Sequence, residues 1–175
     1  QDLDGALKEY HAALKVDPKS REVKSRLAAL YFALGDLTQA VQYADEVGEG
    51  TGQDPQMLTH MAGILASAGK LDRAVELLDT AIESDPERGE SYFPKGLILL
   101  NQKRIAAAEQ VVKKGLQYTA DSPIGYYYLG RISIEAGNSE QAVASFDRAM
   151  AINQAFEPAY LAQASVYESR QEKDK

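Results

Sequence analysis

The side chains that could do chemistry are few in this sequence, and they do not converge. Its only histidines, His11 and His60, fall on unlike faces of different predicted helices, so no histidine pair for acid–base catalysis is indicated. Adjacent carboxylates such as Asp45 and Glu46 diverge on a helix. Motifs for phosphate loops, dinucleotide loops, zinc proteases and serine hydrolases do not occur in it. We therefore predict no enzyme activity, no catalytic residues, no metal site and no cofactor.

The remaining candidate chemistry is that of a protein-binding surface. At about 100° per residue, Tyr126, Leu129, Gly130 and Ser133 form one packing face of a predicted helix, and a second stripe lies opposite. Aromatic and arginine side chains, which this stripe carries, are typical of interface hot spots. Its candidate partner-binding residues are Phe93, Leu97, Leu100, Tyr127, Tyr128, Arg131, Ile134 and Leu161.

We expect these side chains to lie on an open face and to be dispensable for packing. The alternative, that they fill space against neighbouring repeats, stays open. In the first half of the chain the corresponding residues are mostly small or polar, among them Ser25, Ala29, Thr59, His60 and Gly63. The stripe therefore predicts binding in the C-terminal half.

The elements that position this stripe repeat with a period of 34 residues. Alanine recurs in every repeat, where a larger side chain would push two packed helices apart, at Ala6, Ala40, Ala74, Ala108 and Ala142. Large aliphatic residues recur between the small ones, at Leu30, Ile64, Ile98, Ile132 and Val166. These two columns predict a core between successive helix hairpins.

Turn residues follow the same period. Gly35, Gly69 and Gly137 are expected to end the first helix of their hairpins in the left-handed region. Lys103 takes the fourth such place, which predicts either another turn geometry or strain. Pro94 predicts that its helix begins late, near Ser91, or kinks. The glycines of residues 47–55 predict a mobile loop.

The recurring small, aliphatic and turn residues predict one continuous array of helical repeats. We expect full two-helix repeats in residues 21–54, 55–88, 89–122 and 123–156. Residues 1–20 are expected to form the second helix of a truncated repeat, and residues 157–175 the first helix of another. Both ends then cut through a repeat, which predicts an excerpt from a longer protein. The last helix is expected to expose Tyr160, Ala164 and Tyr167.

The small-aromatic-small series Ala142, Phe146 and Ala149, together with the pair Leu129 and Gly130, resembles the motif of the tetratricopeptide repeat family. The resemblance covers the whole chain. It implies an all-α fold, a right-handed superhelical solenoid of antiparallel helix hairpins with about ten helices. It also implies that the second stripe lines a concave groove that binds peptide segments of partner proteins.

Composition narrows the range of partners. The net charge of −7 argues against a nucleic-acid or anionic-membrane binder. No apolar run approaches the ~20 residues of a membrane helix, so we expect no direct membrane binding by this segment. The chain has no cysteine, which suits the cytoplasm and the periplasm alike.

We expect a scaffold that binds a peptide or helical segment of an unidentified partner protein. Two alternatives stay open. The chain is either the regulatory or substrate-recruiting arm of an enzyme whose catalytic domain lies outside this sequence, or a self-assembly scaffold that associates through its truncated ends.

Overall fold

The computed structural model describes residues 2–50, 52 and 54–173. Over these residues the fold is all-α, as the sequence predicted, with ten α-helices, one 3-10 turn and no strand. The first five helices are α1 Leu3–Val16, α2 Arg21–Ala33, α3 Leu37–Val47, α4 Pro55–Ser67 and α5 Leu71–Ser84. The turn η1 Gly89–Ser91 then precedes α6 Tyr92–Asn101, α7 Ile105–Tyr118, α8 Pro123–Glu135, α9 Ser139–Ile152 and α10 Glu157–Lys173.

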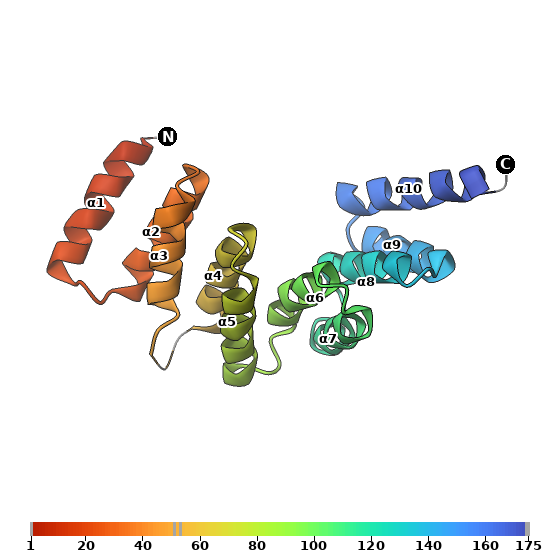
Figure 1. Ribbon diagram of the computed structural model, residues 1–175, viewed down its shortest axis with the longest axis horizontal. Coiled ribbons are helices and arrows are strands. Elements are labelled where there is room, and N and C mark those ends of the chain that lie inside the picture. The colour runs from red at the N-terminus through yellow and green to blue at the C-terminus, as the bar shows by residue number, and fades with distance from the viewer. Residues whose placement is uncertain (1, 51, 53, 174–175) are drawn as a thin grey trace. The chain divides into compact units, whose positions relative to one another are not determined.

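The chain divides into two compact units between Asp85 and Pro86. In the N-terminal unit α2 pairs with α3 and α4 with α5, while α1 packs on α2 (Figure 1). In the C-terminal unit α6 pairs with α7 and α8 with α9, and α10 packs on α9 and α8. The first helix of each following hairpin thus packs on the hairpin before it within each unit.

Side-chain caps and one proline fix where the helices begin. Ser20 and Asp54 accept hydrogen bonds from backbone N–H groups in the first turns of α2 and α4. Pro94 occupies the first turn of α6, which begins only at Tyr92, after the 3-10 turn of η1. The late start predicted from Pro94 is therefore confirmed, since proline fits the first turn of a helix but not its interior.

The repeating small and aliphatic residues form the core, as predicted. Ala40, Ala74, Ala108 and Ala142 have no exposed surface. Members of the aliphatic column are buried beside them, at Ile64, Ile98, Ile132 and Val166. Only Ala6 and Leu30, which open their columns on α1 and α2, remain partly exposed.

Enlarging the small column should destabilise the fold. Ala142 lies fully buried in a cluster with Phe146 and Ala149, so Ala142→Leu must displace packed side chains. We expect the free energy of unfolding to fall by about 1–3 kcal/mol, measured by chemical denaturation followed by circular dichroism. Ala12→Leu, at an exposed position of α1, is the matched control and should change stability by less than about 0.5 kcal/mol. Equal losses in the two variants would contradict this packing argument.

The turns inside the hairpins share one backbone conformation. Gly35, Gly69 and Gly137 have φ of 80°, 78° and 78°, and Lys103 takes the same left-handed region with φ of 60°. The sequence left open how Lys103 would turn the chain. The turn keeps the geometry of the others and is strained, because a side chain in this region meets its own backbone.

The strain at Lys103 can be measured by comparing two variants. Lys103→Gly and Lys103→Ala both remove the ion pair from Lys103 Nζ to Glu135 Oε2, which spans 2.6 Å. Only glycine also removes the Cβ that strains the turn, at some cost in chain entropy. We expect the glycine variant to be about 1 kcal/mol more stable than the alanine variant in urea denaturation. Equal stability would mean that the turn is unstrained.

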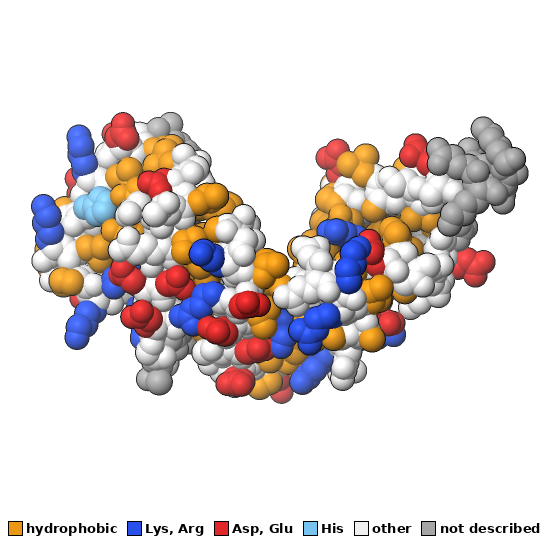
Figure 2. Space-filling view, viewed as in Figure 1, with side chains coloured by type: hydrophobic (Ala, Val, Ile, Leu, Met, Phe, Trp, Pro, Cys, Tyr) orange, Lys and Arg blue, Asp and Glu red, His pale blue; other side chains and the backbone are white. Residues whose placement is uncertain are grey.

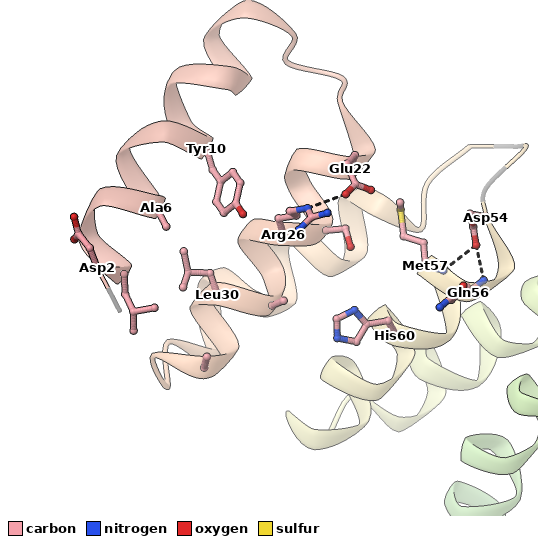
Figure 3. A pocket seen from close by; sticks show the side chains of 14 residues that line it. Asp2, Ala6, Tyr10, Glu22, Arg26, Leu30, Asp54, Gln56, Met57 and His60 are labelled. Carbon is pink, nitrogen blue, oxygen red and sulfur yellow. Dashed lines mark hydrogen bonds and ion pairs between the residues drawn. The ribbon is translucent and has the colours of Figure 1, made fainter. Parts of the chain in front are cut away.

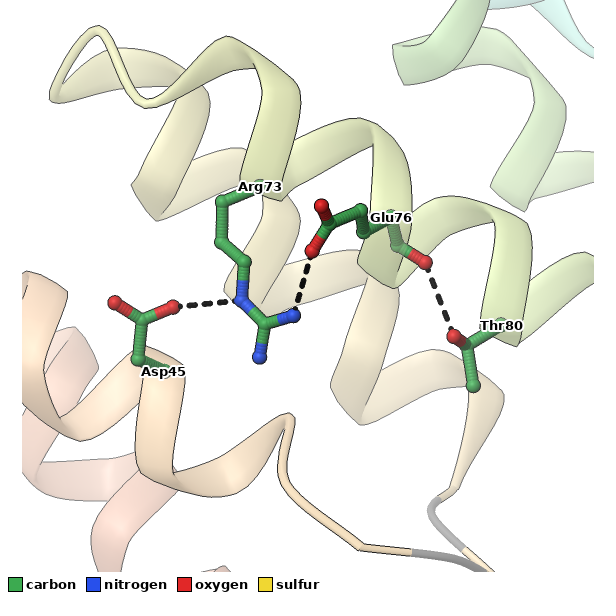
Figure 4. Close-up of polar contacts among 4 residues, drawn as sticks. All are labelled: Asp45, Arg73, Glu76 and Thr80. Atoms are coloured by element: carbon green, nitrogen blue, oxygen red, sulfur yellow. Dashed lines mark hydrogen bonds and ion pairs between the residues drawn. The ribbon is translucent and has the colours of Figure 1, made fainter.

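Polar side chains join α3 to its neighbours α2 and α5 in the N-terminal unit. Arg73 on α5 donates from Nε to Asp45 Oδ1 on α3 at 2.9 Å and from Nη1 to Glu76 Oε2 at 2.8 Å (Figure 4). The hydrogen bonds to Glu76 and Asp45 raise the pKa of the Arg73 guanidinium. Lys24, which stands where the last three repeats have Tyr92, Tyr126 and Tyr160, pairs instead with Glu46 at 2.8 Å. Acidic and basic side chains are interspersed on the face drawn in Figure 2.

Two further predictions concern the loop and the membrane. The predicted mobile loop, residues 47–55, includes residues 51 and 53, which lie outside the described residues. Within the described chain, none of the helices combines the length and the apolar character needed to span a bilayer.

Candidate functional site

Two residues predicted for the binding stripe belong to the core instead. Phe93 and Leu100 on α6 are only 2% and 3% exposed, and they share a cluster with Val112 on α7 and Ile132 on α8. The prediction that they lie on an open face is therefore wrong. The physical reason is that α8 covers this side of α6.

The packing of Phe93 is especially close. A Cβ atom added at Gly115 or at Gly125 would lie 2.8 Å from the Phe93 ring. The ring thus fills a slot that exists because two neighbouring helices carry glycine there. Phe93 holds α7 and α8 against α6, so it is a packing residue.

Three other residues of the stripe are half-buried. Leu97 is partly covered, and Tyr128 packs against the Phe93 cluster, where burial raises the pKa of its hydroxyl. Tyr127 packs against Phe146 and Phe156, with ring centroids 6.0 Å and 5.7 Å apart. The prediction that Tyr127 is dispensable for packing is therefore wrong, because its ring joins α8 to α9 and to the loop before α10.

The rest of the stripe stays accessible. Ile134 is 41% exposed, Leu161 is 62% exposed, and the guanidinium carbon of Arg131 lies 5.9 Å from the centre of the Tyr127 ring. Arg131 and Ile134 line a shallow hollow of about 230 Å³, together with Lys103 and Glu135. The structure thus brings part of the predicted stripe together, in a site too small for a peptide segment.

A much larger hollow lies in the N-terminal unit, where sequence analysis did not place the binding site. This N-terminal groove has a volume of about 960 Å³ and is formed by α1, α2 and α4 (Figure 3). Its lining residues are Asp2, Leu3, Ala6, Tyr10, Glu22, Ser25, Arg26, Ala29, Leu30, Ala33, Asp54, Gln56, Met57 and His60.

Small side chains and one uncovered helix produce this groove. Ser25, Ala29 and Ala33 line it from α2 and are too short to fill it. None of the residues of α1 is fully buried, and Ala6 and Tyr10 line the groove on the side of α1 that faces α2. The small residues of α2 at the positions of the predicted stripe could have indicated this groove. The prediction instead favoured the C-terminal half, because the large apolar residues of the stripe lie there.

The polar groups of the groove are arranged around one ion pair. Arg26 donates from Nε to Glu22 Oε1 at 2.8 Å, and this hydrogen bond raises the pKa of the guanidinium. Asp2 and Asp54 accept hydrogen bonds from the first turns of α1 and α4. The lining thus carries three carboxylates and one guanidinium, so with histidine counted as neutral it holds two negative charges more than positive ones.

The histidines do not form a catalytic or metal-binding pair. His11 Nε2 lies 2.9 Å from the Tyr31 hydroxyl, and the Tyr31 and Tyr43 rings stack 5.8 Å apart beside it. This cluster joins α1, α2 and α3, which is a structural role. Across the residues that the structure describes, no group of three histidine, cysteine or acidic side chains is placed to hold a metal ion.

Known proteins share the repeat and the fold. Human mitochondrial import receptor subunit TOM70 is 26% identical over 90 residues, which is 51% of this chain but only 15% of that protein. A tetratricopeptide repeat protein of Parabacteroides merdae aligns with a TM-score of 0.81 at 20% identity, over 95% of this chain and 66% of its own. YrrB, described as a TPR protein with an unusual peptide-binding site, aligns with a TM-score of 0.72 at 18% identity, over 93% of this chain and 84% of its own. At these identities the structural likenesses show the fold alone.

Three family models describe the same repeat in successive parts of the chain. Each is a model of the tetratricopeptide repeat, and they match residues 1–64, 62–123 and 125–156. These matches agree with the 34-residue period, the helix hairpins and the buried alanine column. The chain belongs to the tetratricopeptide repeat (TPR) family.

Proposed function

We propose that the chain is a protein-interaction scaffold that holds a segment of another protein in the N-terminal groove. The observation that carries this proposal is the size of the groove, about 960 Å³, within a family whose members are generally non-catalytic scaffolds for other proteins. Ligand sites in proteins commonly have volumes of about 300–1,000 Å³. YrrB, which has this fold, is described as having a peptide-binding site.

The groove favours a segment with apolar and cationic side chains. Leu3, Ala29, Leu30 and Met57 offer apolar surface along its walls. The excess of carboxylates would attract lysine or arginine and repel acidic segments. The bound segment is therefore proposed to place an apolar side chain over Ala29 and a cation near Asp54.

The exposed part of the predicted stripe is proposed as a second, smaller contact surface in the C-terminal unit. It comprises Arg131, Ile134 and Leu161. Arg131 lies over the Tyr127 ring, which limits the freedom of its side chain and would reduce the entropy that it loses on binding. Its guanidinium suits a carboxylate or a backbone carbonyl of the partner.

Selection from a random peptide library tests the proposal without knowledge of the natural partner. Peptides displayed on phage would be selected on the immobilised chain, synthesised, and measured by calorimetry. We expect micromolar binders enriched in apolar residues with lysine or arginine. A selection that yields no binders, or only acidic peptides, would contradict the proposed chemistry of the groove.

A further inference from the structure

Gly63 lies in the middle of α4, where the helix itself does not favour a glycine. Inside a helix, glycine loses more backbone entropy on folding than alanine does, and it contributes no side chain to packing. The other full repeats carry Ala29, Leu97 and Arg131 at this repeat position, so the repeat does not require glycine there. The reason for Gly63 therefore has to come from its surroundings.

Packing explains other glycines of the helices but not Gly63. A Cβ atom at Gly130 would overlap the Phe146 ring. The same holds, with other side chains, for Gly96, Gly115 and Gly125. Gly63 is exposed, and apart from its own helix no part of the N-terminal unit lies within 4 Å of the place that a Cβ would take. The space beside Gly63 is thus open to a molecule from outside the chain.

This open position adjoins the N-terminal groove. At about 100° per residue, Gln56, His60, Gly63 and Ser67 share one face of α4, and all four are exposed. Gln56 and His60 line the groove (Figure 3). Gly63 follows His60 by one helical turn, so it continues the wall that α4 contributes to the groove.

The polar side chains of this face suit an extended main chain. Ser67 donates its hydroxyl to the Gly63 carbonyl at 2.9 Å. Among the described residues, neither the Gln56 amide nor the His60 ring has a hydrogen-bond partner, so both are available to a ligand. An extended segment carries an N–H donor and a C=O acceptor at each residue, and these need partners once water is excluded. A helical segment has already paired most of its own.

We propose that Gly63 allows the main chain of an extended partner segment to lie directly on α4. Without a Cβ at this position, the partner backbone comes close enough to the helix to reach the Gln56 amide and the His60 ring. A side chain at residue 63 would hold the backbone away from both. The inference rests on the proposed function, because it specifies how a segment bound in the N-terminal groove is held.

Two substitutions at this one position test the inference. Gly63→Ala and Gly63→Leu both favour the helix and place their side chains in open space, so both variants should fold. We expect each to raise the melting temperature by about 2–4 °C. In calorimetry, peptides selected on the wild-type chain should bind Gly63→Ala about tenfold more weakly and Gly63→Leu about a hundredfold more weakly. A purely structural role of Gly63 would not combine higher stability with lower affinity.

One control and one further measurement complete the test. Ala12→Leu adds the same side chain at an exposed position of α1 outside the groove, and it should leave the affinity unchanged. A selected peptide labelled with carbon-13 reports its own backbone conformation by NMR. We expect its bound-state chemical shifts to be those of extended chain.

The outcomes separate this inference from the proposed function. If Gly63→Leu binds as tightly as the wild type while Ala29→Arg binds weakly, the groove is the peptide site and the inference about Gly63 is wrong. If neither variant changes the affinity, or no peptide is selected, the proposed function fails together with the inference. Helical chemical shifts of the bound peptide, or an equal loss of affinity in Ala12→Leu, would also overturn it.

Discussion

Replacing Phe93 with alanine will lower the free energy of unfolding of the C-terminal unit by about 3–5 kcal/mol. The ring is 2% exposed and fills the slot beside Gly115 and Gly125, so its removal leaves a cavity lined by two helices that cannot close easily. Urea denaturation followed by circular dichroism measures the loss. Leu161→Ala, on the exposed face of α10, is the control and should change stability by less than about 0.5 kcal/mol.

The result distinguishes a packing residue from a binding residue. If the Phe93→Ala variant is as stable as the wild type but loses affinity for selected peptides, Phe93 lies on a binding face, as its position in the sequence pattern suggested. If it is destabilised and Leu161→Ala is not, Phe93 is core and the peptide site lies elsewhere.

Replacing Ala29 with arginine will weaken the binding of selected peptides by about 2 kcal/mol or more, which is about thirtyfold. Ala29 is partly exposed at the wall of the N-terminal groove, so the long side chain enters the space that the peptide needs. The added cation also repels the lysine or arginine that the groove is proposed to attract. Calorimetry measures the affinity, and thermal melting of the same sample shows that the fold is kept.

The control for this prediction adds the same side chain in the same unit. Ala12→Arg lies on an exposed part of α1 outside the groove and should leave the affinity unchanged. Equal affinity of Ala29→Arg and wild type would exclude the groove as the peptide site. A loss of affinity in both variants would point to a general effect of charge.

The core and the helix order could be predicted from the sequence because they depend on periodicity. A 34-residue repeat with alanine in every unit allows one arrangement of close-packed hairpins, and Ala40, Ala74, Ala108 and Ala142 are indeed buried. The late start of α6 followed from Pro94, whose restriction acts within one helical turn. Local chemistry was sufficient for these features.

The binding surface could not be predicted as well, because it depends on which neighbours cover a helix face. Phe93 and Leu100 have the spacing of an exposed stripe, yet α8 covers them in the structure. Conversely, Ser25 and Ala29 looked uninformative, although their small size opens the N-terminal groove of about 960 Å³. A helical periodicity gives the direction of a side chain but does not say what lies opposite it.

The most direct test of the account is to map a selected peptide on the chain by NMR. Amide shifts of the labelled chain would be followed while the peptide is added. We predict that the largest changes fall on the groove helices, in residues 25–33 of α2 and 56–60 of α4, with α3 and α5 nearly unchanged. Changes concentrated on α3 and α5, which do not line the groove, or in the C-terminal unit alone, would contradict the assignment of the N-terminal groove as the protein-binding site.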